Sequence, residues 1–406
     1  MAQKLKFGNG TWATKEGSTL AYNDEGNNYK PLPFSFERNS IATRVNKEGL
    51  IEVVGNDIPR IDYTDSTDGV LLLENSSTNL VTHSEDFTDS SWSPTPSLVS
   101  VSSNQYISPD GSQNADRLQI QSTNSLAILA DLVPHTINVN ISISAWVKSN
   151  TNSVEKIKLF GDYGTSNAVS SEFLVTDTWR RIEFTFTPTA TGNRNVGFYN
   201  VSNLSTDIQI YGFQAEQGSY ATSYIPTSGS TVPRAAETAN GSGNSEVFND
   251  SEGVLFADIA ALANDGTNRM ISLSNGISNS SNATLYFIPT ANQIKYIYEV
   301  NSSQKCNIVA NINVLLNNKF SIVYKLNRFE LWGNGFKLGE DTNGTLNPQG
   351  TFTKLSFLRG ASQLPFYGKT KELGYYDIAL TDAELEYMTS YRSLNEMVTE
   401  LNLNAL

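Results

Sequence analysis

Cysteine and histidine are nearly absent from this sequence. There is one cysteine, Cys306, and there are two histidines, His83 and His135. A single thiol cannot form an internal disulfide, and so few ligands argue against a Cys/His zinc site. A Ser-His-Asp triad would depend on one of the two histidines, and neither lies in a nucleophile motif such as G-x-S-x-G. The sequence therefore predicts no catalytic residues and no enzyme.

Basic charge and long apolar runs are scarce as well. The chain has 28 basic and 41 acidic residues, a formal net charge of −13. Nucleic-acid binding relies on basic patches, so this balance argues against it. No stretch reaches the roughly 18 apolar residues that span a bilayer, and the N-terminal MAQKLKFGNGTW lacks the apolar core of a signal peptide. We expect no membrane insertion, and release by lysis or within a particle if the protein acts outside a cell.

Asparagine, serine and aromatic residues are what the sequence has in quantity. Among 406 residues, 43 are Asn and 46 are Ser, more than a fifth of the chain, and aromatic residues make up 10%. This composition is typical of exposed β proteins and unlike that of helical bundles. The hydrophobic share of 39% suffices for packed cores, and the length suggests two or three domains.

Alternating apolar residues predict a first β-sandwich over residues 83–235. In INVNISISAWVKS (137–149), apolar side chains recur at every second position from Ile137 to Val147. WRRIEFTFTP (179–188) repeats the pattern, and turn residues separate these runs. Such strands indicate an antiparallel sandwich, in whose core we expect Trp146 and Trp179.

A second block of strand patterns covers residues 247–392. Within it, ELWGNGFKLG predicts a hairpin, because Asn334-Gly335 can supply the positive φ values of a type I′ turn. The last part, LTDAELEYMTSYRSLNEMVTELN, predicts one helix with Thr381 or Asp382 as N-cap and Glu384 near its third position.

Residues 34–92 resemble a module of tailed-bacteriophage virion proteins. The shared pieces run in order along the chain: Phe36, Arg38, Ser40 and Ala42-Thr43; Gly49-Leu50-Ile51; Pro59-Arg60 and Asp62-Tyr63; Leu71 to Glu74; Thr78-Asn79-Leu80; Ser84 to Phe87; and Trp92. The number and order of these pieces make the match specific.

The rest of the chain carries two further resemblances. SPDGSQNADRL (108–118), ISAWVKS and GFQAEQGSYATSYIPTSGSTVPRAAETA (212–239) resemble carbohydrate-binding-module-like jelly rolls of phage fibres. FELWGNGFKLG and LGYYDIALTDAELEYM resemble a concanavalin A/laminin-G-like sandwich. Together they imply an all-β chain: an N-terminal β-rich attachment region (1–82), a jelly roll (83–235), a linker (236–246), a concanavalin A-like sandwich (247–392) and a short C-terminal helical tail (393–406).

The resemblance also implies a function. We expect a bacteriophage virion structural protein, a fibre or a tail or head appendage, located in the virion and attached to other virion proteins. It would bind host-surface glycans as a homo-oligomer, a trimer. Two alternatives stay open: a spacer or capsid or collar decoration that binds nothing, and a polysaccharide depolymerase.

Candidate binding residues follow from the chemistry of sugars and of calcium. Exposed aromatic faces stack on sugar rings, which makes Trp332, Tyr296 and Tyr298 candidates, although core packing or a subunit interface would use the same residues. Jelly rolls of this kind often hold a structural calcium, and the resemblance implies Glu85, Asp86, Asp110 and Glu216 as its ligands. Glu216 stands where related modules have an aspartate. Because of this difference, the alternative stays open that the protein binds no calcium and no other cofactor.

Overall fold

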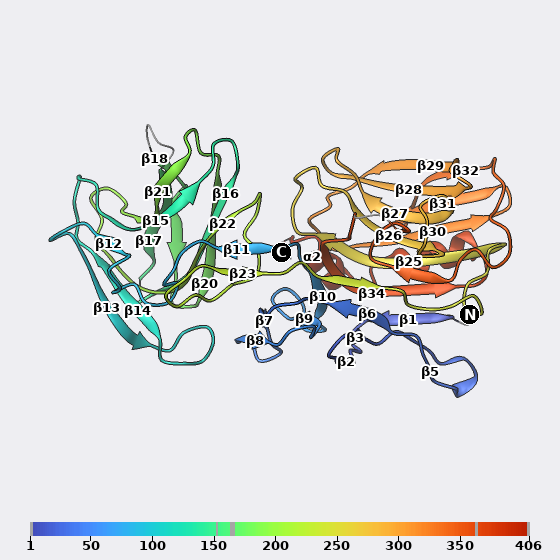
Figure 1. Cartoon of the computed structure of the whole chain (residues 1–406), viewed down its shortest axis with the longest axis horizontal. Helices are drawn as coiled ribbons and strands as arrows, with labels where there is room; N and C mark the ends of the chain where they lie inside the picture. The colour runs from blue at the N-terminus through green and yellow to red at the C-terminus, as the bar shows by residue number, and fades with distance from the viewer. Residues whose placement is uncertain (1–2, 152, 163–166, 362–363, 404–406) are drawn as a thin grey trace. The chain divides into compact units, whose positions relative to one another are not determined.

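The chain divides into two units, each built from antiparallel β-sheets (Figure 1). The structure, a computed structural model, describes residues 3–151, 153–162, 167–361 and 364–403. Unit 1 comprises Met1–Asn39, Gly55–Asn75 and Ala236–Leu406, and unit 2 comprises Ser40–Val54 and Ser76–Ala235. Unit 2 is thus inserted into unit 1, and the chain passes between them at 39/40, 54/55, 75/76 and 235/236. The predicted all-β fold class is confirmed.

Unit 2 is a sandwich of two sheets with two short additional strand pairs. The first sheet contains β12 (Ser93–Pro94), β15 (Ile128–His135), β21 (Gly192–Tyr199), β17 (Glu155–Asp162) and β18 (Asn167–Val169), and β19 (Phe173–Val175) also pairs with β17. The second has the order β13 (Val99–Tyr106), β14 (Ala115–Ile120), β22 (Thr206–Gln217), β16 (Ile141–Ser149) and β20 (Arg180–Phe186). The additional pairs are β7 (Ala42–Val45) with β8 (Ile51–Val54), and β11 (Ser77–Asn79) with β23 (Val232–Arg234).

The alternation in the sequence explains the core of unit 2. Ile141, Ile143, Ala145 and Val147 of β16 are fully buried among side chains of both sheets. Period-two alternation sends these residues to one face and their neighbours to the other. The predicted strand 137–149 starts later than expected, because Ile137 and Val139 lie in an exposed turn before β16.

Unit 1 is a larger sandwich. One sheet has the order β32 (Phe336–Asp341), β31 (Arg328–Gly333), β30 (Asn318–Lys325), β25 (Glu252–Ala261), β34 (Gly368–Tyr376), β1 (Leu5–Gly8), β4 (Tyr22–Asn23) and β5 (Lys30–Pro31), with β10 (Val70–Leu73) also on β34 and β9 (Arg60–Asp62) on β10. The opposing sheet has the order β29 (Ser303–Asn311), β28 (Gln293–Val300), β27 (Asn282–Phe287), β26 (Arg269–Ser274) and β33 (Lys354–Ser356). One aromatic and aliphatic core fills the sandwich.

A smaller sheet extends the second layer of unit 1. It has the order β2 (Thr14–Lys15), β3 (Ser18–Thr19), β6 (Phe34–Glu37) and β24 (Thr238–Asn240). Backbone hydrogen bonds then join β24 to β33: Phe357 N donates to Ala239 O at 3.1 Å, and Leu355 N donates to Ser242 O at 2.8 Å. Phe34, Phe36 and Ala239 consequently belong to the same core as the C-terminal strands.

The observed units differ from the predicted domain boundaries. Residues 1–82 were expected to form a separate attachment region, but β1 pairs with β34 over four residues, from Leu5 with Tyr375 to Gly8 with Glu372 (Figure 1). The expected linker 236–246 contains β24 and the bridge from Ser242 to Leu355. Unit 2 corresponds to the predicted jelly roll with residues 40–54 and 76–82 added. Strand pairings between residues so far apart produce no local sequence pattern from which these unit boundaries could be predicted.

The predicted hairpin is confirmed, and the predicted helix is interrupted. Asn334 and Gly335 have φ values of 50° and 88° and connect β31 to β32. Thr381 caps α1 (Asp382–Thr389) and forms a capping box with Glu384. Extended backbone at Ser390 ends this helix, and Ser393 starts α2 (Leu394–Glu400) with a cap of its own. One short 3₁₀ turn covers Glu25–Asn27. Within the described residues, no helix is long and apolar enough to span a bilayer.

A buried ionic network joins four segments of unit 1. Arg60 is fully buried and contacts both Glu74, at 2.9 Å, and Glu237. Arg38 reaches the same Glu237 at 2.8 Å and donates to the carbonyl oxygen of Ile58 at 2.9 Å. Burial works against the charged form of Arg60, but the two carboxylates more than offset it and raise its pKa. Arg38, Arg60 and Glu74 belong to the phage-like pattern in the sequence, so that pattern encodes a buried framework.

A second charged group lies between β25, β34 and α2. Asp258 and Glu372 face each other across the two strands. Burial raises the pKa of Asp258 to about 6 and that of Glu372 to about 7. Lys319 pairs with Glu396, and Lys371 pairs with Glu400 at 2.7 Å, so these cations are engaged by the carboxylates of α2.

Removing one partner from the ionic network should destabilise the protein strongly. We expect Arg60→Gln to lower the free energy of unfolding by about 3–5 kcal/mol, because it removes the buried guanidinium that Glu74 and Glu237 share. Urea denaturation measures the change. Arg44→Gln, which breaks the partly exposed pair with Glu52, is the matched control and should cost less than about 1 kcal/mol. Equal effects of the two substitutions would contradict this account.

Stability should fall between about pH 4 and pH 7. A carboxyl group whose pKa is raised by folding favours the protonated folded state, so its stabilisation is complete at low pH and is lost as pH rises. Asp258→Asn should therefore flatten the pH dependence and raise the free energy of unfolding at pH 7 by about 1–3 kcal/mol. Chemical denaturation at several pH values checks this. Glu16→Gln, at an exposed turn, should leave the curve unchanged, and a steeper curve for Asp258→Asn would refute the assignment.

Candidate functional site

The three aromatic residues predicted to bind sugar lie in the interior of unit 1. Trp332 is 5% exposed, and Tyr296 and Tyr298 are fully buried. Tyr296 donates its hydroxyl to the carbonyl oxygen of Val323 at 3.1 Å, and Tyr298 accepts from the backbone N–H of Asn347 at 3.1 Å. A sugar ring cannot stack on a face that other side chains cover. The prediction of these residues as a sugar platform is wrong, and core packing accounts for them.

Two of the four predicted calcium ligands meet in unit 2. The hydroxyl oxygen of Tyr211 lies 3.1 Å from both Glu85 Oε1 and Asp110 Oδ2, and its single proton can be donated to either. Glu85 Oε1 also accepts from the hydroxyl of Tyr224 at 2.9 Å. Burial raises the pKa of Glu85, although these hydroxyl donors act in the opposite direction. Hydroxyl groups therefore already satisfy the oxygens that a cation would need.

The other two predicted ligands lie elsewhere. Asp86 Oδ1 accepts from the backbone and hydroxyl of Thr88. Glu216 is fully buried and accepts from Ser77, from Gln214 at 2.6 Å and from the hydroxyl of Thr222 at 2.7 Å. Among the described residues, no three Asp, Glu, His or Cys side chains are grouped so that they could hold a metal ion. The four predicted ligands therefore do not form one calcium site.

The outer face of the second sheet of unit 2 carries an array of polar side chains. Leu118, Val147 and Ile208 point into the core, so the residues beside them point outward. We call this outward surface the polar face; it comprises Ser100, Ser102, Arg117, Gln119, Lys148, Asn150, Asp207 and Gln209.

Strand register arranges these residues in two rows. Ser102, Arg117, Gln209 and Lys148 are direct neighbours on β13, β14, β22 and β16. Ser100, Gln119 and Asp207 form the second row, which Asn150 completes through its backbone bond to Asp207 at 3.1 Å. Strands lie about 4.8 Å apart, so each row is about 14 Å long. This length suits an extended ligand rather than a single ion.

Asp207 fixes the geometry of the polar face. It accepts from Arg117 Nε at 2.9 Å and Nη2 at 2.5 Å, from Asn150 at 2.8 Å and from Gln119 at 3.2 Å. Gln209 donates to Asn150 at 3.0 Å and extends the network. The hydrogen bond from Arg117 is the main cause that lowers the pKa of Asp207. Because the side chains hold one another, their remaining donors and acceptors are oriented before any ligand arrives.

Lys148 and Trp179 complete this surface. In the part of the chain that the structure describes, the Lys148 ammonium group makes no hydrogen bond or ion pair, so it is available to a ligand. Trp179 directly precedes β20, whose first residue, Arg180, pairs with Val147. Trp179 is partly exposed, packs against the cluster that contains Tyr211 and Tyr224, and donates its ring N–H to the carbonyl oxygen of Ile107 at 3.2 Å.

The sequence predicts that Trp146 and Trp179 lie in the core of unit 2. Both instead lie on the outer side of this sheet, in a satellite cluster with Tyr211 and Tyr224. The Arg181 guanidinium lies 4.7 Å from the Trp146 ring centroid, a cation–π contact. The alternation of apolar residues could have predicted the outward position of Trp146, because this residue lies between the inward-facing Ala145 and Val147.

Comparison with protein-family models and with curated protein sequences finds no match. Among solved structures, the CBM40 domain of Ruminococcus gnavus IT-sialidase bound to alpha2,3 sialyllactose is 15% identical, over 37% of this chain and 94% of its own, with a TM-score of 0.32. The CBM22-1 xylan-binding domain of Paenibacillus barcinonensis Xyn10C is 15% identical, over 37% of this chain and 99% of its own, with a TM-score of 0.30. The enzymatically active domain of tailspike protein 4 of bacteriophage CBA120 is 15% identical, over 34% of this chain and 21% of its own, with a TM-score of 0.26. These likenesses are too slight to assign a function.

Calcium should not stabilise the protein. We expect the thermal midpoint of chelator-treated protein to stay within about 1 °C when millimolar calcium is added, since Tyr211 and Tyr224 already satisfy Glu85 and since Glu216 lies elsewhere. Differential scanning calorimetry checks this. Glu85→Gln provides the control: a calcium-dependent rise in the wild type that this variant lacks would restore Glu85 as a ligand.

Proposed function

We propose that the polar face of unit 2 binds a glycan without cleaving it. The observation that carries the proposal is the pre-oriented array around Asp207, flanked by the exposed part of the Trp179 ring. Sugars offer hydroxyl groups to planar amide and guanidinium groups and offer C–H groups to an indole face. The two rows supply several such amide and guanidinium groups, and Lys148 adds a donor without a hydrogen-bond or ion-pair partner among the described residues.

A binding role fits the carboxylate chemistry of this face. Glycosidases need two carboxyl groups about 5–9.5 Å apart across the scissile bond. Asp207 is the one acid of the polar face, and its paired state lowers its pKa, which is unsuited to a general acid. The arrangement supports recognition better than hydrolysis.

The sequence resemblance supports the setting of this activity. Residues 34–92 resemble a module of tailed-phage virion proteins, so we propose a fibre or a tail or head appendage located in the virion, where it contacts other virion proteins. A homotrimer would present three glycan sites together, and linkage of weak sites raises avidity without new contacts. The acidic composition agrees with a role that involves neither nucleic acid nor insertion into a membrane.

Substitutions on the polar face should weaken glycan binding. We expect Trp179→Ala and Lys148→Ala each to lower affinity for host surface polysaccharide by about fivefold to tenfold, through loss of ring stacking and of a charge-assisted donor. Isothermal titration or a glycan array with the full chain measures this. Lys148→Ala is the cleaner variant, because within the described residues no hydrogen bond or ion pair of this side chain is lost.

Lys156→Ala, on the other sheet of unit 2, is the matched control and should bind like the wild type. If no host glycan or host cell binds the wild-type chain, the protein is a spacer or decoration and the proposal fails. If new reducing ends appear during incubation with polysaccharide, the protein is a depolymerase and the non-enzymatic role fails.

A further inference from the structure

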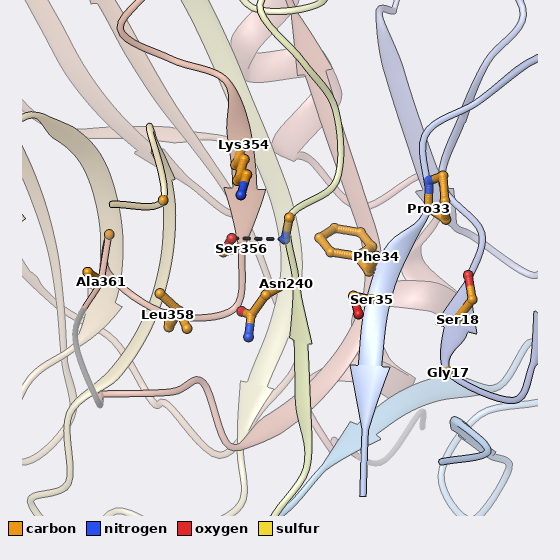
Figure 2. Close-up of a pocket in the computed structure, with 13 residues that line it drawn as sticks. Gly17, Ser18, Pro33, Phe34, Ser35, Asn240, Lys354, Ser356, Leu358 and Ala361 are labelled. Atoms are coloured by element: carbon orange, nitrogen blue, oxygen red, sulfur yellow. Dashed lines mark hydrogen bonds between the residues drawn. The ribbon is translucent and has the colours of Figure 1, made fainter. Parts of the chain in front are cut away.

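Unit 1 contains a cavity of about 720 Å³ on the outer side of its extended sheet (Figure 2). Its floor is formed by neighbouring strands: Ser35 of β6 pairs with Asn240 of β24, and Ser356 of β33 accepts from the backbone N–H of Gly241 at 3.0 Å. The volume lies within the range of small-molecule sites. This cavity belongs to unit 1, shares no residue with the polar face and does not depend on the function proposed for that face.

Glycines keep the cavity open. Gly17, Gly241 and Gly276 line it, and all three have positive φ values. A Cβ at Gly276 would lie 2.7 Å from Cδ of Lys354, so the missing side chain leaves room for the lysine. Any other residue at Gly276 would strain the backbone and displace Lys354.

Lys354 is the one charged residue among the described residues that line the cavity. It is exposed, and within the described residues its ammonium group has no hydrogen bond or ion pair. Among the described residues that line the cavity there is no carboxylate to oppose a negatively charged ligand. A cation that lacks an internal partner at the rim of a concave site favours an anion.

The floor is suited to hydroxyl groups. Oδ1 of Asn240 is buried and has no hydrogen-bond partner among the described residues, and a buried acceptor without a donor costs free energy. The hydroxyls of Ser18 and Ser35 lie in the same lining. Asn240 lines the cavity, so a shift of its carboxamide toward a bound ligand would let a ligand hydroxyl donate to Oδ1 and remove this cost.

The backbone amides discriminate between types of anion. Phosphate sites in loops use several free N–H groups that converge on the ligand. Here the lining glycines have already used theirs: Gly17 N–H donates to Asp57 O at 2.9 Å, Gly241 N–H to Leu355 O at 3.1 Å and Gly276 N–H to Ser274 Oγ at 3.1 Å. One lysine and a set of hydroxyl partners suit a carboxylate on a hydroxyl-rich molecule better than a phosphate.

We propose that this cavity binds an acidic sugar, with the carboxylate of a uronic acid at Lys354 and its hydroxyl groups at Asn240 and the floor serines. Leu358 and Pro33 supply apolar surface for the C–H side of the ring. The polar face and this cavity would then give one chain two separate sugar sites, one in each unit.

The test uses the full chain and two probes, digalacturonic acid and a hyaluronan tetrasaccharide, with digalactose as the neutral counterpart. Titration calorimetry at low salt should show binding of at least one acidic probe and much weaker binding of digalactose. Lys354→Gln should lower affinity by at least about tenfold. Asn240→Asp, which adds a negative charge at nearly constant volume, should lower it at least as much.

Lys30→Gln, at an exposed position of unit 1, and Lys148→Ala, on the polar face, should bind the acidic probes like the wild type. A roughly fivefold to tenfold lower affinity of Lys148→Ala for host glycan, with unchanged uronate binding, separates the two sites. The proposal is overturned if neither acidic probe binds at millimolar concentration, if Lys354→Gln binds like the wild type, or if inorganic phosphate binds as tightly as the acidic sugars.

Discussion

Unit 1 depends on a buried contact between two guanidinium groups and two carboxylates. Arg38 and Arg60 share Glu237, and Arg60 also holds Glu74, in an environment from which water is excluded. Each of these residues lies close to a point where the chain leaves or enters the unit. Unpaired, any one of them would carry a heavy desolvation penalty, so the contact forms only when all four segments are in place. The ionic contact therefore determines which segments of unit 1 come together, and hydrophobic burial alone would be less selective.

Local patterns in the sequence predicted what local forces determine. The alternation of β16, the Asn334-Gly335 turn and the capping box at Thr381 and Glu384 each depend on a few neighbouring residues, and all three are present. The boundaries of the units depend on pairings such as β1 with β34, which no local pattern encodes. The break in the C-terminal helix depends on Ser393, whose capping role competes with continuation of the helix.

The candidate sites were harder to predict for the same reason. A tryptophan has the same composition signal whether it is buried or exposed. Trp332 is buried because it packs with Leu380 and Leu385 at α1, whereas Trp179 stays partly exposed. The calcium set failed because Glu85 and Asp110 meet hydroxyl donors from residues more than a hundred positions away. The residues that line the cavity at Lys354 come from five separate segments of the chain. No local sequence motif could therefore predict this cavity.

The insertion of unit 2 into unit 1 has a consequence for the order of folding. All residues of unit 2 have been synthesised once Ala235 is reached, whereas β1 must wait for its partner β34, which starts at Gly368. Pairing of β11 with β23 brings residues 77–79 against 232–234 and closes the inserted segment. A closed insert shortens the effective loop between the early and late strands of unit 1, and the entropy cost of joining them falls accordingly. The inserted sandwich thus acts as an internal folding aid for the unit that surrounds it in sequence.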